Sequence, residues 1–155
     1  MIFAALAFSL FSCSEKGDEE NGEKTPITAS VTYIVSDVLD LRDIANVTVS
    51  YKDADGTMKS IALTQQSWNF NIENIDSLPF EAELILDAKL KTDIKYSKEK
   101  YNIGRTIKID YKLSDGTIVI SGNSADNSIG LKPENFEHAF KRFPKTDKVT
   151  VQERN

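Results

Sequence analysis

Apolar residues recur at every second position along most of the chain after Pro26, and mostly polar residues stand between them. A period of two is typical of β-strands that bury one face and leave the other in water. We therefore predict strands in antiparallel sheets that each have one solvated face. The runs that carry this pattern are 29–35, 47–51, 68–72, 82–90 and 107–113.

Two Asp-Gly pairs mark the sharpest predicted turns. Asp55-Gly56 and Asp115-Gly116 each stand between two strand-like runs, and residues that accept a positive φ close β-hairpins at such positions. Before residue 132 the chain has no long segment with a helical period of 3.6. These features predict an all-β fold, an antiparallel β-sandwich of about seven strands, with an up-and-down barrel as the alternative.

One short C-terminal helix is also expected. Pro133 suits the first position of a helix, and Pro144 ends the segment. Phe136, Phe140 and Phe143 follow the spacing i, i+4 and i+7, which places them on one helix face. We expect this face to close one end of the sandwich; an exposed aromatic stripe for a partner is the alternative.

Residues 1–12 have the pattern of an export signal. Residues 2–12 carry no charge, which matches the apolar region of a signal peptide, and they are too few to span a bilayer. Leu10-Phe11-Ser12-Cys13 resembles the bacterial lipobox. The resemblance implies that residues 1–12 are removed and that Cys13 becomes the acylated first residue. The alternative is that the run is a core element and Cys13 a buried small hydrophobe.

Residues 13–26 are predicted to form a flexible acidic tether. From Ser14 to Lys24 the chain has no apolar side chain to bury. Acidic residues directly after the cysteine resemble the surface-export signal of Bacteroidota-type lipoproteins. This implies a lipid anchor in the outer membrane, with residues 27–155 as a β-sandwich domain that faces the cell exterior. A charged spacer on the periplasmic face is the alternative.

Composition narrows the possible chemistry. The chain has 155 residues with one cysteine and one histidine, so it cannot form an internal disulfide or a closed zinc site of Cys and His ligands. No cofactor or metal is expected. A net charge of −5 argues against a nucleic-acid partner. The charge is uneven, because residues 13–88 carry 5 basic and 15 acidic side chains, whereas residues 89–155 carry 14 basic and 9 acidic ones.

The strand segments resemble those of a known class of proteins. The relevant text is ANVTVSYKDADGTMKSIALTQQSWNFNIENIDSLPFEAELILDAK, which begins at Ala45, and YNIGRTIKIDY, which begins at Tyr101. Together with the lipobox and the tether, these segments resemble the small surface lipoproteins of gut Bacteroidota that carry one immunoglobulin-like sandwich. The resemblance implies an immunoglobulin-like fold, and it assigns a role to no residue other than Cys13.

The densest basic region, residues 89–108, is the candidate binding site. It combines seven basic side chains with two tyrosines, and the four residues predicted to contact a ligand are Lys95, Tyr96, Lys98 and Tyr101. A basic loop with exposed tyrosines suits an acidic glycan or an acidic protein surface. The alternative is a solvated hairpin whose lysines keep an edge strand from pairing with other chains.

Other candidate sites are less specific. Asp53-Ala54-Asp55-Gly56 fails as a calcium-binding loop, because such a loop requires a glutamate where Ala62 stands. His138 lies outside any hydrolase motif, and nothing singles out one pair of carboxylates for glycoside hydrolysis. Trp68 could stack on a sugar, but its apolar run favours a place in the core.

We therefore predict a non-catalytic, lipid-anchored binding module at the cell surface for a glycan or protein partner. The first alternative is a structural subunit of an envelope or polysaccharide-uptake assembly. The second is a hydrolase, which would require a cleft with two converging carboxylates.

Overall fold

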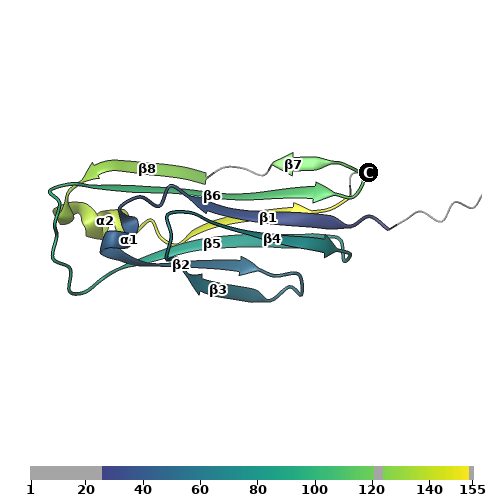
Figure 1. Cartoon of the computed structure of the whole chain (residues 1–155), viewed down its shortest axis with the longest axis horizontal. Coiled ribbons are helices and arrows are strands. Elements are labelled where there is room, and N and C mark those ends of the chain that lie inside the picture. The colour runs from purple at the N-terminus through teal and green to yellow at the C-terminus, as the bar shows by residue number, and fades with distance from the viewer. Residues whose placement is uncertain (1–25, 121–123, 154–155) are drawn as a thin grey trace, which may run out of the picture.

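The strands form two antiparallel sheets that pack against each other (Figure 1). The structure is a computed structural model that describes residues 26–120 and 124–153. The predicted signal peptide, Cys13 and nearly all of the predicted tether lie outside the described residues. The all-β prediction is confirmed, and the described residues form nine strands rather than about seven.

The first sheet is built around β1 and β6. β6 (Tyr101–Leu113) pairs on one side with β1 (Ala29–Ser36), which pairs in turn with β4 (Trp68–Ile75). On its other side β6 pairs with β8 (Ser124–Leu131) over its first half and with β7 (Ile118–Ile120) near its end. β6 is therefore the strand that joins the two halves of this sheet.

The second sheet has β2 (Ala45–Lys52) and β5 (Phe80–Leu90) at its centre. β3 (Met58–Ala62) flanks β2, and β9 (Lys145–Val151) flanks β5. In the part of the chain that the structure describes, the two sheets share no strand pairing. The molecule is therefore layered, and the alternative of a closed barrel is not adopted.

Alternate residues of these strands form one core between the sheets. Val31 and Tyr33 of β1 are fully buried, and so are Leu84 and Leu86 of β5, whereas their neighbours in sequence lie outward. This confirms the predicted period of two. Burying one large apolar side chain stabilises the fold by about 1.5–3 kcal/mol. Trp68, expected in the core, is only partly buried, because β4 is an end strand of its sheet.

Both predicted hairpins are present. In the turn between β2 and β3, the amide of Asp53 donates to the carbonyl of Thr57 at 2.9 Å. Gly56 in this turn and Gly116 in the turn between β6 and β7 have φ angles of 78° and 92°. Residues with a Cβ rarely adopt such angles, so glycine fits both turns.

The predicted C-terminal helix consists of a 3-10 turn, η1 (Pro133–Asn135), and α2 (Phe136–Phe140). Phe136 is buried, and Phe140 and Phe143 pack partly buried against the core. These side chains close one end of the sandwich, as predicted. A second helix, α1 (Leu41–Ile44), was not expected, because four residues are too few to show a helical period.

The two ends of the molecule differ (Figure 1). α1, α2 and the loop of residues 91–100 lie at one end, which we call the helical end. The chain arrives from Pro26 at the opposite end, where β1 begins, and we call this the entry end. The 13 residues of β6 run along the axis between them, a length of about 40 Å at about 3.3 Å per residue.

Candidate functional site

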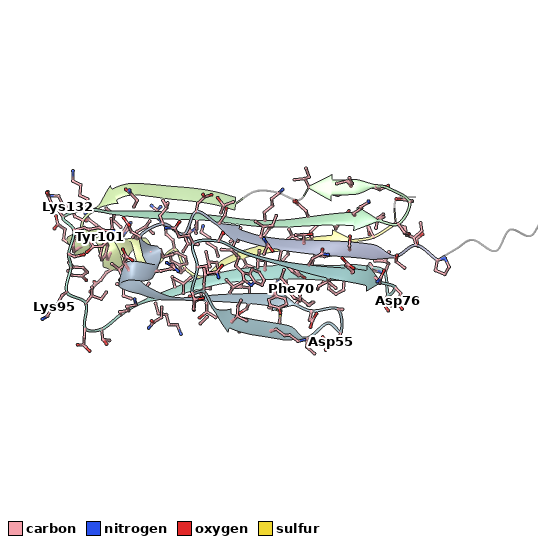
Figure 2. All side chains as sticks on the ribbon, viewed as in Figure 1. Asp55, Phe70, Asp76, Lys95, Tyr101 and Lys132 are labelled. Carbon is pink, nitrogen blue, oxygen red and sulfur yellow. The ribbon has the colours of Figure 1, made fainter. Side chains whose placement is uncertain are left out.

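The predicted site residues belong to the loop of residues 91–100 and the first residue of β6. This loop carries the chain from β5 in one sheet to β6 in the other. Figure 2 labels Lys95 and Tyr101 at the helical end, far from Asp55 and Asp76 at the other end. Loops fixed on a rigid scaffold often carry binding residues, so the question is which of these side chains remain free.

Tyr101 holds the loop rather than facing a ligand. Its side chain is buried, with 2% of its surface exposed. Its hydroxyl oxygen accepts hydrogen bonds from the amides of Ser97 and Lys98, at 2.9 and 3.1 Å. Its ring packs edge-on against Phe136, with the ring centroids 5.5 Å apart. Tyr101 therefore fixes the backbone of the loop.

Lys98 is held in a pair of salt bridges to the segment that includes α1. Its Nζ lies 2.8 Å from Asp40 Oδ1 and 3.1 Å from Asp43 Oδ2. The hydrogen bond from Lys98, helped by the amide of Asn102, lowers the pKa of Asp40, and the two carboxylates raise the pKa of Lys98. The positive charge of Lys98 is thus balanced by two carboxylates of the protein, so Lys98 attracts an anionic ligand only weakly.

Tyr96 and Lys95 remain available at the surface. Tyr96 has 48% of its surface exposed, although its ring rests edge-on against Phe136, with the ring centroids 5.5 Å apart, and against Tyr101, with the centroids 6.2 Å apart. Lys95 is exposed beside it in the chain. Of the four predicted residues, Tyr101 and Lys98 therefore support the loop, while Tyr96 and Lys95 are exposed at the surface.

A groove of about 550 Å³ opens on the second sheet, close to α1. β3 is last paired with β2 at Thr48 opposite Ala62, followed by one hydrogen bond from the Leu63 amide to the Val47 carbonyl at 2.8 Å. The first residues of β2 consequently have no β3 residue beside them. The polar and charged residues that line the groove are Arg42, Asp43, Asn46, Thr48, Thr64 and Lys91.

The sequence predicted no site at this groove. Of the residues that line it, only Lys91 belongs to the basic region of residues 89–108. Arg42 lies between acidic residues in the chain, and its Nη1 donates to the carbonyl of Thr64, 22 positions later. The basic character of Lys91 was the one visible signal. The other lining residues come together only through the way β2 and β3 diverge.

Other residues considered from the sequence lie elsewhere. Asp53 forms a hydrogen-bonded ion pair with Lys59 at the hairpin tip. His138 is exposed on α2. Arg105, also in the basic region, is buried and lies with its guanidinium 4.5 Å from the centroid of the Phe143 ring. Asp53 and Arg105 therefore contribute to local structure, and His138 lies outside the predicted site.

No protein-family model matches the chain, and no curated protein sequence matches it either. Among residues 26–120 and 124–153, no group of three or more His, Cys, Asp or Glu side chains is arranged to hold a metal ion. The same part of the chain contains no helix long and apolar enough to cross a membrane. The proposals below therefore rest on the sequence and on the geometry of this chain alone.

Proposed function

We propose that this protein is a non-catalytic binding module, lipid-anchored through Cys13 to the outer membrane, that holds a glycan at the cell exterior. The observation that carries the proposal is the helical end, where the exposed ring of Tyr96 stands beside Lys95 on a loop that Tyr101 and Lys98 hold in place. An exposed aromatic ring offers a flat apolar face to a sugar, and the lysine offers a donor to its oxygens.

The positions of the two ends of the molecule support a binding surface at the helical end. β1 begins at the entry end, and the loop of residues 91–100 lies at the helical end (Figure 1). A tether of residues 13–26 that leads to a membrane would therefore leave the loop about 40 Å farther out, the length of β6. A binding surface on an anchored protein is most accessible at the end that points away from the membrane.

We further propose that the sandwich is of the immunoglobulin-like kind. β1 pairs with β4, β2 pairs with β3 and β5, and β5 pairs with β9. In the immunoglobulin fold strand B pairs in the same way with E, C with C′ and F, and F with G. β6 lies beside β1, in the place of strand A, although it follows β5 in the chain. Such a sandwich suits a scaffold that presents loops at its ends.

A structural subunit of an envelope or uptake assembly is the second candidate. It is favoured by β7, where Ile118 and Ile120 have 66% and 68% of their surfaces exposed. Uncovered isoleucines on a short strand at a sheet edge suit contact with another protein. This candidate predicts a protein partner near the entry end rather than a glycan at the helical end.

A glycan array tests the first candidate. The full chain, purified in detergent, is expected to retain a set of glycans, and Tyr96→Ala should weaken the best of them by about tenfold, or about 1.4 kcal/mol. Ile118→Ala, which changes an even more exposed apolar residue on β7, serves as the control and should bind as the unaltered protein does.

Two outcomes would contradict the proposal. One is equal loss of glycan binding in the Tyr96 and Ile118 variants. The other is an array on which the unaltered protein retains nothing, while a partner protein co-purifies with it from membranes at fixed stoichiometry and is lost from the Ile118→Ala variant. That second result would establish the structural-subunit candidate instead.

A further inference from the structure

We infer that the groove between β2 and β3 binds an anionic saccharide and that Arg42 and Lys91 hold its carboxylate. This inference rests on the proposed function, because it names the ligand class of a glycan-binding module. The groove is a second contact surface beside the one at Tyr96. Lys91 lines the groove and is also the first residue of the loop that carries Tyr96. One extended sugar chain could contact both.

Both cations of the groove are fixed by backbone carbonyl groups. Lys91 Nζ donates to the carbonyls of Arg42 and Asp43, at 2.8 and 3.3 Å. Arg42 Nη1 donates to the carbonyl of Thr64. These bonds set the positions of the two side chains at the groove while leaving further N–H donors on each of them. Fixed side chains lose little conformational entropy when a ligand binds.

Two positive charges, Arg42 and Lys91, and one carboxylate, that of Asp43, line the groove. In the described residues neither Arg42 nor Lys91 forms an ion pair, and the carboxylate of Asp43 lies 3.1 Å from Lys98 Nζ instead. On the neighbouring strand, Lys89 is the register partner of Asn46 and Asp87 is the register partner of Thr48, so these two positions add one charge of each sign beside the groove. The groove therefore attracts an anion, on a protein whose net charge is −5.

The rest of the lining suits sugar hydroxyls. Asn46 and Thr64 are exposed, and Thr48 is partly exposed on the outer face of β2. Their amide and hydroxyl groups both donate and accept hydrogen bonds, as sugar hydroxyls do. Ala62, the register partner of Thr48, adds a small apolar surface to the lining. A volume of about 550 Å³ is within the usual range of ligand sites.

The anion that we assign to these donors is the carboxylate of a sugar acid. The planar guanidinium of Arg42 matches the two oxygens of a carboxylate, and Lys91 supplies a point charge beside it. The groove is open and its lining mixes six polar or charged residues with four apolar ones, so it does not offer the enclosed apolar surface that a lipid chain requires. A sugar acid in a polysaccharide satisfies the charge, the hydroxyl pairing and the open shape together.

Polygalacturonate and its fully methyl-esterified form make a matched pair of probes, because they differ only at the carboxyl group, which is a charged carboxylate in one and a neutral methyl ester in the other. We expect the full chain, purified in detergent, to bind the acid form and to bind the ester at least about tenfold more weakly by titration calorimetry. Binding of the acid form should also weaken as salt rises from about 0.05 to about 0.5 M. Sulfated dextran tests whether any polyanion is sufficient.

Variants locate the contact. Arg42→Gln and Lys91→Gln should each weaken binding of the acid form by about tenfold, whereas Lys112→Gln removes one exposed positive charge near the entry end and should have no effect. Thr48→Val removes a groove hydroxyl without touching α1, and it should weaken binding by a smaller factor. It keeps the test informative if circular dichroism shows that the Arg42 variant does not fold.

Equal binding of acid and ester, or equal binding by all four variants, would overturn the inference. Sulfated dextran that binds as tightly as polygalacturonate would overturn the assignment of a carboxylate. If other glycans bind and are lost with Tyr96→Ala while polygalacturonate does not bind, the inference fails and the proposed function stands. If no glycan binds at all, the proposed function fails as well.

Discussion

At the scale of single residues, the helical end separates supporting side chains from available ones. Tyr101 and Tyr96 are five positions apart, yet one is 2% exposed and the other 48% exposed. Tyr101 is an inward residue of β6, and its hydroxyl accepts hydrogen bonds from two backbone amides of the loop, whereas Tyr96 lies on the loop itself. A tyrosine that holds a loop and a tyrosine that meets a partner cannot be told apart by residue type alone.

Tyr101→Phe is predicted to destabilise the protein by about 1–2 kcal/mol, because it leaves the amides of Ser97 and Lys98 without their acceptor. Chemical denaturation measures the loss, and hydrogen exchange should become faster at those two amides. Tyr96→Phe is the matched control and should change stability by less than about 0.5 kcal/mol. Unchanged exchange at both amides in Tyr101→Phe would rule out this role.

Lys98 shows what cannot be predicted from the sequence about a single residue. Lys98 was expected to be a ligand contact because it is basic and lies near two tyrosines. Its carboxylate partners, Asp40 and Asp43, are 58 and 55 positions earlier in the chain. No local pattern connects residues at that separation, so the balance of its charge becomes visible only in the folded chain.

At the scale of elements, α1 and the loop of residues 91–100 behave as one unit. The amide of Asp40 donates to the carbonyl of Asn102 at 2.9 Å, and the amide of Asn102 donates to Asp40 Oδ2 at 2.8 Å. With the Lys98 salt bridges, these bonds join the segment before α1 to the start of β6. The unit contains both ends of the loop. Because the carboxylate of Asp40 accepts hydrogen bonds from Lys98 and from the Asn102 amide, the geometry of the unit depends on the ionised form of Asp40.

The pKa of Asp40, lowered from 3.8 by Lys98 and by the Asn102 amide, predicts an acid-sensitive contribution to stability. A lowered folded-state pKa stabilises the protein above the unfolded-state value, and the contribution is lost as pH falls through the folded-state pKa. Asp40→Asn should therefore be less stable than the unaltered protein at pH 7, and the difference should shrink below about pH 4.

Denaturation curves at pH 7 and pH 3 provide the measurement. Asp76→Asn, an exposed aspartate at the other end of the molecule (Figure 2), is the control for removing one negative charge. A stability difference for Asp40→Asn that stays constant from pH 7 to pH 3 would contradict the role given to its ionised form.

Elements also differ in how clearly their sequences show them. β5 and the second half of β6 were predicted because apolar residues alternate along them, and their inward residues are buried as expected. Residues 101–106 of β6 were not predicted, because they belong to the basic region that was interpreted as a loop. β8 was missed because the sequence of Ser124–Leu131 is mostly polar and does not alternate. The groove beside α1 could not be predicted either, because it exists where β3 stops pairing with β2, and a strand end is among the least certain features of a sequence pattern.

At the scale of the whole molecule, the proposed anchor can be tested directly. Cys13→Ala should move the protein from the membrane fraction to the soluble fraction, because acyl chains on Cys13 are the attachment that we propose. Cell fractionation with immunoblotting is the measurement, and protease treatment of intact cells reports whether the domain of residues 27–155 faces outward. Continued membrane association of the variant would exclude lipidation at Cys13 as the anchor.

The place of β1 in the first sheet has a mechanical consequence. β1 lies between β4 and β6 and is hydrogen-bonded to a neighbour on both sides. If the membrane pulls on the start of β1 while a bound polymer pulls on the helical end, the force runs parallel to the strands. These hydrogen bonds then carry the load in shear and share it, whereas a peeling force would break them one after another. The topology therefore suits a protein under tension between a cell and the material it holds.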